Sequence, residues 1–432
     1  MKAIINATIY DFYKYKENQY ILFDDSIIDV GSMEKYGFSG EYEEVVDIKG
    51  SLILPGLIVG HGHMYGAFMR GCNFSPCSPM NFKEHLEQVY WKIDGGLDLD
   101  STYHSGKVMS VDHIKCGVTT LFDHHASGVN IAGTLDQLKK AWVDEAGLRG
   151  VFCFETSDRF DINDCISENV NFNNKGKSEK HAAMFGVHAS LSVSDETLSK
   201  ISESIGNIPL HVHIAESLED QTESIARYGK RIVERFVDFG LVNENSLFAH
   251  CVNIDEKEAA LMAKYGCTAA INVTSNLNTG NGIPDYRLLK RYGIRTIIGN
   301  DSLGTNIASD IRNTLFAMHL RTKSPWWFSY EDILNCVRNS YDYASIILGI
   351  KLGRLEKGYK ADFLSVDYHA PTEMSENNIW GHIFDGVFNS FHPRNVWCDG
   401  QAKLRNYETV LDEEKICAEA KISSKKLWNR IG

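Results

Sequence analysis

Two histidines with one residue between them, His61 and His63, end the apolar segment Leu-Pro-Gly-Leu-Ile-Val-Gly-His-Gly-His. Side chains two apart on an extended strand point to the same face, so both imidazoles can approach one metal ion, and the intervening glycines leave room for it. The chain has 16 His, and a second pair of the same spacing occurs at His211 and His213. The spacing alone is therefore weak evidence for a metal site, and the position of each pair in the fold has to show which pair could bind a metal.

Residues of metal-binding or acid–base type also follow later apolar runs. His213, His250 and Asp301 lie at or just past the ends of the fifth, sixth and eighth of eight such runs. The runs are Leu52–Val59, Val118–Phe122, Gly150–Phe154, Met184–His188, Pro209–Ile214, Ser246–His250, Thr268–Val273 and Arg295–Gly299. In a (β/α)8 barrel the carboxyl ends of the strands converge at one mouth, where active sites are found. We therefore expect these residues to meet.

The segments between the runs have helical patterning, as in Leu135–Ala146 and Gln221–Phe239. Short apolar runs alternating with helices are typical of an α/β fold with parallel strands, and eight units predict a TIM-like (β/α)8 barrel. Spacing alone also allows an open doubly wound sheet, although the GxGxxG and GxxxxGKS/T fingerprints of two common nucleotide-binding folds are absent from the sequence.

The two flanks of the chain have a different pattern. Short strands are predicted at Ala3–Tyr10, Tyr20–Phe23 and Ser26–Val30, and again at Ala361–Val366 and Asn395–Cys398. We expect one small β-sandwich built from both termini. The predicted division is residues 1–54 for its first part, 55–350 for the barrel, and 351–432 for its second part plus a C-terminal helix over Asp412–Arg430.

Composition excludes several classes of protein. The 432 residues include 44 Lys+Arg and 57 Asp+Glu, a net charge of −13, so a nucleic-acid partner is not expected. The ten Cys are scattered without a CxxC pair, which indicates reduced thiols rather than a disulfide framework. Apolar runs are too short for a signal peptide or a membrane span. We expect a cytoplasmic protein with no membrane partner.

Several motifs, in order, resemble those of the amidohydrolase superfamily, in its aminohydrolase branch of nucleobase and nucleoside deaminases and triazine chlorohydrolases. They are Leu54–Ile58 with His61-Gly62-His63, His213-Ile-Ala-Glu216, Ala249-His250-Cys251, Gly299-Asn300-Asp301 and Gly353–Asp362. Three further segments look most like the SsnA-type aminohydrolases, namely Tyr90–Asp94, Asp123–Ser127 and Thr156–Arg159. The resemblance spans nearly the whole chain.

The resemblance implies a site for one divalent metal ion, Zn²⁺ or alternatively Fe²⁺, since imidazole and carboxylate ligands suit both. Its implied ligands are His61, His63, His213 and Asp301. A second ion would usually require a carboxylated Lys at a middle strand, and the fourth run ends in Phe-Gly-Val-His-Ala-Ser. The family spacing HxxE selects His213 over His211, which is left as a packed residue or one that supports a ligand.

The implied reaction is hydrolytic deamination of a purine-, pyrimidine- or triazine-like ring, with release of ammonia. A bound metal lowers the pKa of water, Asp301 accepts its proton, and Glu216 delivers a proton to the ring nitrogen and then to the leaving group. His250 orients the water or stabilises the adduct. Hydrolysis of a cyclic amide or a ring chloride by the same metal site is the alternative among enzymes, and a non-catalytic binding protein is the alternative from another class.

The expected partner is a small heterocyclic molecule. His188 matches a substrate-binding histidine of the family, and His125 and Arg159 follow the second and third runs, where they could face the mouth. Trp91 could stack on the substrate as a lid or serve in packing. A homodimer is implied by the family only.

Overall fold

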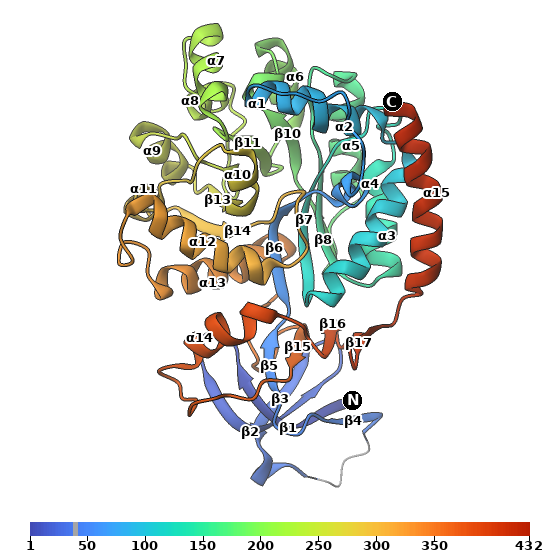
Figure 1. Ribbon diagram of the computed structural model, residues 1–432, viewed down its shortest axis with the longest axis vertical. Helices are drawn as coiled ribbons and strands as arrows, with labels where there is room; N and C mark the ends of the chain where they lie inside the picture. Colours follow the sequence, from blue (N-terminus) through green and yellow to red (C-terminus); the bar gives the residue numbers. More distant parts are fainter. Residues whose placement is uncertain (38–41) are drawn as a thin grey trace.

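The computed structural model describes residues 1–37 and 42–432. Within these residues the strands form two parallel sheets and one mixed sheet. Figure 1 shows the parallel strands β6–β14 in one half of the molecule, with helices around them, and the mixed sheet with the N-terminus in the other half. The fold is therefore of the mixed α/β type that the sequence predicts.

The parallel strands are almost entirely buried, as expected for sheets covered on both faces. One sheet has the order β6-β7-β8-β9 and the other the order β10-β11-β12-β13-β14. Their bounds are β6 (Leu57–Gly62), β7 (Val118–His125), β8 (Arg149–Phe154), β9 (His181–Ala183), β10 (Phe185–Ala189), β11 (Leu210–Ile214), β12 (Leu247–His250), β13 (Thr268–Ile271) and β14 (Arg295–Ile298). Each of the eight predicted runs overlaps one of these strands, and β9 lies outside the runs.

Single parallel bridges join the two sheets, Gly62 to Asp301 and Thr156 to Val187. Glycines allow the first of these contacts: a Cβ on Gly60 would lie 2.9 Å from the Ile298 carbonyl oxygen. Gly60 thus makes room for the neighbouring backbone, and this close approach brings Asp301 to the histidine pair. That the glycines also leave room for a metal stays a prediction.

The first predicted run, Leu52–Val59, divides at Gly56 into two strands. The part before it, β5 (Leu52–Pro55), pairs with strands of the mixed sheet, and the part after it is β6. Gly56 donates its N–H to the Asp362 carbonyl oxygen at 3.0 Å, so the chain passes from one sheet to the other at this residue.

Helices connect the parallel strands. Their bounds are α3 (Leu99–Lys115), α4 (Thr134–Lys139) continued by η4 (Lys140–Glu145), α5 (Ile162–Asn174), α6 (Asp195–Ile205), α7 (Leu218–Tyr228), α8 (Ile232–Asp238), α9 (Glu256–Lys264), α10 (Val273–Thr279), α11 (Tyr286–Arg291), α12 (Ile307–Thr322) and α13 (Tyr330–Leu348). The predicted helix Gln221–Phe239 is two helices, because Gly229 adopts a left-handed conformation (φ 69°) and ends α7. Across residues 1–37 and 42–432, no helix is long and apolar enough to span a membrane.

The mixed sheet is built from both ends of the chain. Its order is β18-β17-β16-β15-β5-β1-β2-β3, with β4 paired to β1. The remaining bounds are β1 (Lys2–Tyr10), β2 (Tyr15–Phe23), β3 (Ile27–Ser32), β4 (Glu44–Asp47), β15 (Phe363–Val366), β16 (Asn395–Cys398), β17 (Gln401–Arg405) and β18 (Glu408–Thr409). Apolar side chains such as Ile4, Ile53 and Trp397 form a core cluster of their own. The described strands make one continuous hydrogen-bonded sheet where two facing sheets are expected.

A covering segment follows β6 over the ends of the parallel strands. It comprises η2 (Met64–Met69), α1 (Phe82–His85), η3 (Leu86–Tyr90) and α2 (Trp91–Gly96). The C-terminal helix α15 (Glu413–Ile431) returns from the mixed sheet and lies against α3 and α2 (Figure 1). Trp428 Nε1 of α15 donates to the Phe68 carbonyl oxygen at 2.8 Å, so this helix packs on the covering segment. The shorter helical turns are η1 (Met33–Lys35), η5 (Ser190–Ser192), α14 (Ile379–Gly381), η6 (His382–Val387) and η7 (Phe388–Ser390).

A buried ion cluster joins the mixed sheet to the amino-terminal end of the parallel strands. Arg149, the first residue of β8, is fully buried and donates from Nε to Asp362 Oδ2 at 2.7 Å. Its Nη2 donates to Asp362 Oδ1 at 3.0 Å and to Asp399 Oδ1 at 2.8 Å. This junction occupies one end of the parallel strands, and the carboxyl ends remain available for a site.

Candidate active site

The carboxyl ends of the parallel strands bring together the five residues that the sequence singles out there. His61 and His63 lie at the end of β6, His213 in β11, His250 at the end of β12, and Asp301 just past β14. All five are buried. The register of β11 and β12 pairs Ile214 with His250. Residues far apart in sequence therefore meet because the strands are parallel and in this order.

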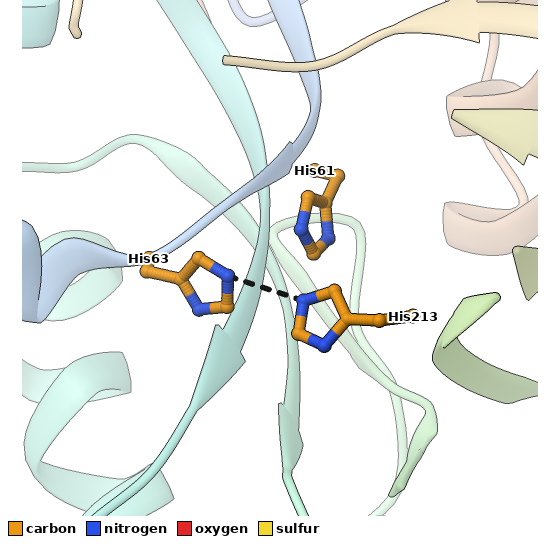
Figure 2. A group of neighbouring side chains, drawn as sticks. All are labelled: His61, His63 and His213. Carbon is orange, nitrogen blue, oxygen red and sulfur yellow. Dashed lines mark hydrogen bonds between the residues drawn. The ribbon is translucent and has the colours of Figure 1, made fainter. Parts of the chain in front are cut away.

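Figure 2 shows the rings of His61, His63 and His213 pointing toward one another. One ring nitrogen from each lies within 4.8 Å of one nitrogen of each of the others, and Nε2 of His63 is 3.3 Å from Nε2 of His213. Nδ1 of His213 donates to the His188 carbonyl oxygen at 2.9 Å, and Nδ1 of His63 donates to the His124 carbonyl oxygen. In a neutral ring these bonds fix the tautomer that leaves Nε2 unprotonated, which is how metal-binding histidines are oriented.

His211 lies behind this group. Its Nε2 is 2.8 Å from Nδ1 of His61, and its Nδ1 is 3.4 Å from the Cys153 sulfur. Within the described part of the chain, Nε2 of His61 has no hydrogen-bond partner although the side chain is buried. A buried polar atom without a partner is costly, and a cation between the three rings would satisfy it.

Asp301 completes the group. Its Oδ1 is 3.2 Å from Nε2 of His63, and its Oδ2 accepts a hydrogen bond from Ser275 Oγ at 2.6 Å. Burial opposes ionisation, but the bond to His63 and the nearby charges hold the pKa of Asp301 well below its usual range. Burial likewise opposes charge on His63, yet Asp301 raises the pKa of His63 to about 9. Asp301 thus stabilises positive charge where the rings converge, which a cation site requires.

The net pKa shift of the other two rings has the opposite direction, because neither ring has a carboxylate that offsets its burial. Burial lowers the pKa of His61 and of His213 well below the usual value, with a further contribution from neighbouring histidines. Both rings are therefore neutral at neutral pH, and the neutral imidazole is the form that binds a metal ion. Three imidazoles and a carboxylate are a donor set that fits a divalent ion of the zinc or iron type.

The grouping of His61 with His250 and Asp301 overlaps the first one, whereas a further grouping, His124, Glu155 and His213, also has donor atoms within 4.8 Å of one another. Glu155 in that grouping already accepts a bond from Arg159 Nη2 at 2.6 Å, so a guanidinium cation occupies part of its surroundings. His213 is common to this grouping and the first one, and one imidazole nitrogen binds one ion. The grouping of His61, His63 and His213 with Asp301 is therefore the better cation site.

Glu216 and His250 lie beside this group. Oε2 of Glu216 is 3.5 Å from Nε2 of His250, which is also 3.7 Å from Oδ2 of Asp301. Nδ1 of His250 donates to Asn276 Oδ1 at 2.7 Å, so Nε2 is the nitrogen directed at the two carboxyl groups. Burial raises the pKa of Glu216. A carboxyl group that keeps its proton to higher pH can act as a general acid near neutral pH.

The backbone is strained where these side chains leave their strands. Ala215, His250, Cys251 and Asp301 have positive φ angles of 50°, 71°, 52° and 58°. Such conformations cost free energy for residues other than glycine and persist where the surrounding structure enforces them, typically at functional sites. Here they turn the chain sharply after β11, β12 and β14 and aim the side chains inward.

A small cavity lies between the strand ends and the covering segment. Its volume is about 40 Å³, and it is lined by His63, Tyr65, Phe82, Leu86, Tyr90, Asp94, Glu155, His188, His213, Glu216, Ser275, Thr279 and Asp301. One buried water needs ~10–15 Å³ of such volume, so the cavity is small. A pocket of about 590 Å³ lies outside and shares Phe82 and Thr279 with the cavity.

The four predicted substrate contacts divide into two groups. His188 lines the cavity, with its Nδ1 2.6 Å from Ser192 Oγ. Arg159 is instead paired with Asp94 at 2.7 Å and with Glu155, and its guanidinium carbon lies 5.0 Å from the Trp91 ring centre. His125 is buried and has its Nε2 3.2 Å from Thr102 Oγ1. Arg159, His125 and Trp91 are not among the residues that line this cavity, and their contact with substrate stays a prediction.

Several residues that shape the site were not predicted. Asp94 and Glu155 are buried acids of the cavity wall, and three polar residues near α10 contact the acid–base groups: Ser275, Asn276 and Asn281. Glu155 directly follows the third apolar run, which is a signal that could have identified it. The residues near α10 follow the seventh run, where the sequence has a cluster of Ser and Asn.

Comparisons with known proteins agree with this fold. The Amidohydrolase family profile matches residues 52–403. The chain is 28% identical to a 5-methylthioadenosine/S-adenosylhomocysteine deaminase of Bacillus cereus, covering 96% of this chain and 97% of that protein. It is 25% identical to a 5′-deoxyadenosine deaminase of Methanococcus maripaludis, covering 93% and 94%.

Two solved structures share the fold. An adenosine deaminase from Xanthomonas campestris with bound zinc aligns with a TM-score of 0.83 at 18% identity, over 99% of this chain and 98% of that one. Atrazine chlorohydrolase TrzN from Arthrobacter aurescens, complexed with zinc, aligns with a TM-score of 0.81 at 20% identity, over 98% and 100%.

The family match covers most of the chain, so this protein belongs to the amidohydrolase family, as its sequence motifs indicate. It is a hydrolase that acts on carbon–nitrogen bonds, and its strand ends form a site for a divalent metal ion.

Proposed function

We propose that the protein is a metal-dependent deaminase that removes an amino group from a heteroaromatic ring of the adenosine type and releases ammonia. The observation that carries the proposal is the convergence of His61, His63, His213 and Asp301 at the strand ends, beside a cavity that Glu216 also lines. The names of the two full-length relatives support a substrate of the adenosine type.

The proposed ligands are His61, His63, His213 and Asp301, holding one ion. Zinc is the first choice, with iron(II) as the alternative, because imidazole and carboxylate donors suit both. When bound, the ion supplies a Lewis acid that lowers the pKa of water. The remaining steps depend on groups of the chain.

Asp301 accepts the proton that the attacking water loses, since its pKa is held low and it is ionised at neutral pH. Glu216 has a raised pKa and donates a proton to the ring nitrogen next to the reacting carbon. As the carbonyl forms, Glu216 takes up the proton of the adduct's hydroxyl group and transfers it to the leaving amine, and the proton held by Asp301 restores the Glu216 acid through solvent. His250 lies between these two carboxyl groups and orients the water. His188, in the cavity wall, is the first candidate for a hydrogen bond to the ring.

We also propose that the two parallel sheets form one closed eight-stranded barrel, with β9 as an extra strand beside β8. The bridges at Gly62–Asp301 and Thr156–Val187 support closure. The division into residues 1–54, 55–350 and 351–432 is supported by the assignment of β5 and β15 to the mixed sheet. We propose that this mixed sheet bends into a β-sandwich, whose two halves face each other across the sheet's own core cluster.

A homodimer remains a proposal as well. Large apolar side chains of α12 and the loop after it are exposed, including Leu320 at 73% and Trp326 at 86%. Analytical ultracentrifugation at several protein concentrations measures the oligomeric state directly, and we expect the mass of a dimer.

The test of the proposed function is ammonia release by zinc-loaded protein. The panel should include adenosine, 5′-deoxyadenosine, 5-methylthioadenosine, adenine, guanine, cytosine, a chlorinated triazine and a cyclic amide. We expect ammonia from at least one amino-substituted ring, with adenosine-type compounds turned over fastest. Ring opening or chloride release without ammonia from any substrate would show a different hydrolase, and mass spectrometry of the product separates these outcomes.

A further inference from the structure

Three polar side chains of one short segment contact the three acid–base groups of the site. The segment is α10 with the loop that follows it. Ser275 Oγ donates to Asp301 Oδ2 at 2.6 Å, and Asn276 Oδ1 accepts from Nδ1 of His250 at 2.7 Å. Asn281 Nδ2 donates to Glu216 Oε1 at 3.0 Å. Each contact thus involves a different partner.

We propose that Ser275, Asn276 and Asn281 are positioning residues that hold Asp301, His250 and Glu216 in their reactive orientations. This inference rests on the proposed function for its catalytic consequence. Its structural part, one segment that orients three groups from three different strand ends, stands on the contacts alone.

Each bond selects one atom of its partner. The bond from Asn281 engages Oε1 of Glu216 and leaves Oε2 toward His250, at 3.5 Å. The bond to Asn276 requires a proton on Nδ1 of His250 and therefore directs Nε2 at the carboxyl groups. Without these bonds the carboxyl group could rotate and the imidazole could adopt its other tautomer, so the segment restricts both.

The third bond acts on a proposed metal ligand. Ser275 is buried, and its hydroxyl fixes Oδ2 of Asp301 while Oδ1 accepts from the Ser302 N–H at 2.7 Å. Groups that orient a ligand in this way typically contribute about 10-fold to 100-fold in metal affinity or activity.

The segment is itself held in one conformation. Gly280 ends α10 with a positive φ of 71°, and its N–H donates to the Asn276 carbonyl oxygen. The Asn281 N–H donates to the same oxygen at 3.1 Å. The backbone thus connects the residue that contacts His250 directly to the residue that contacts Glu216, so the two side chains keep a fixed separation.

The test compares two single variants with different predicted losses. Ser275→Ala should weaken zinc binding by about 10-fold to 100-fold, measured by competition with a chromophoric chelator. Asn281→Ala should leave zinc affinity within twofold and lower kcat by about 10-fold to 100-fold, part of the effect typical of an acid–base group. KM should change by less than threefold, since the substrate contacts remain.

Conservative variants and a control separate positioning from folding. Ser275→Thr retains the hydroxyl and should restore most of the zinc affinity, and Asn281→Gln retains the amide and should restore part of kcat. Leu277 lies on the same helix with half of its surface exposed, so Leu277→Ala should match the wild type in both measurements.

Two results would overturn the inference. One is wild-type kcat in Asn281→Ala together with wild-type zinc affinity in Ser275→Ala. The other is a parallel loss of zinc affinity and thermal stability in both variants, which would indicate a general packing role. If the wild type releases no ammonia from any ring, the proposed function fails, and the chelator competition with Ser275→Ala still decides whether this segment orients Asp301.

Discussion

Two buried clusters of charged and polar side chains lie at opposite ends of the parallel strands, and they differ in how completely their hydrogen bonds are made. At the junction with the mixed sheet, Arg149 donates from all three guanidinium nitrogens to Asp362, Asp399 and the Glu179 carbonyl oxygen. At the carboxyl ends, within the part of the chain that the structure describes, Nε2 of His61 and Nε2 of His250 have no hydrogen-bond partner. The first cluster is complete in the protein alone, and the second requires ligands.

Completeness of hydrogen bonding therefore distinguishes a buried charged cluster with a structural role from one with a functional role. Both clusters contain residue types that sequence reasoning associates with chemistry. Arg149 and Asp362 form an ion pair that satisfies itself, and its consequence is the relative placement of the two sheets. The histidines and carboxylates at the other end have opposed pKa shifts and strained backbone, which is typical of a site.

The largest expected effect is that of removing a ligand from the incomplete cluster. His213→Ala should abolish stoichiometric zinc binding and lower kcat/KM by about 10³-fold or more, since the bound ion contributes several kcal/mol to the reaction. Metal analysis after gel filtration and ammonia assays measure the two effects. His392, an exposed residue, gives the matched control His392→Ala. Full zinc content in His213→Ala would contradict the ligand assignment.

Breaking the complete cluster should have a different consequence. Arg149→Met leaves the buried Asp362 carboxylate without its main partner and should lower the free energy of unfolding by about 3–5 kcal/mol. The activity per zinc-bound folded molecule should stay within about twofold. Denaturant unfolding with parallel assays checks both. Arg227, whose pair with Glu223 is at the surface, provides Arg227→Met as a control with an expected loss below ~1 kcal/mol. A fall in activity without a fall in stability would show that the junction is part of the site.

The next effect concerns the acid of the incomplete cluster. Glu216→Gln removes the proton that Glu216 is proposed to deliver and keeps the size of the side chain. We expect kcat to fall by about 100-fold or more with unchanged zinc content. Unchanged turnover in a zinc-loaded variant would show that another group transfers the proton.

Much of this arrangement could be predicted from the sequence, and the exceptions have physical causes. The five residues at the strand ends are predictable because strand periodicity and order place them. The helix break at Gly229 is missed because the apolar pattern continues through it. Asn281 and Ser275 are missed because their role depends on side-chain contacts with strands elsewhere in the chain. The ion pairs of Arg159 with the buried acids Asp94 and Glu155 also depend on such contacts, and its contact with substrate stays a prediction.

The last prediction concerns the pH dependence of stability and a buried acid behind the site. Burial and the nearby Glu216 raise the pKa of Asp220 to about 8. The folded state therefore retains a proton that the unfolded chain loses near pH 4. The stabilisation is complete below pH 4 and is lost as pH rises through about 8.

Asp220→Asn should remove this loss, because the amide carries no charge and can still accept from the Leu191 N–H. The free energy of unfolding of the variant should decline less than that of the wild type between pH 4 and 8. Glu219→Gln, at an exposed position of the same helix, should follow the wild-type curve. Parallel curves for Asp220→Asn and the wild type would mean that Asp220 has an ordinary pKa.

The most direct measurement is anomalous X-ray diffraction from zinc-loaded crystals at the zinc absorption edge. We predict one strong peak among the rings of His61, His63 and His213, at about 2.0–2.2 Å from each Nε2 and from a carboxylate oxygen of Asp301. A zinc-saturated protein whose peak lies elsewhere, for example between His124 and Glu155, would contradict the account.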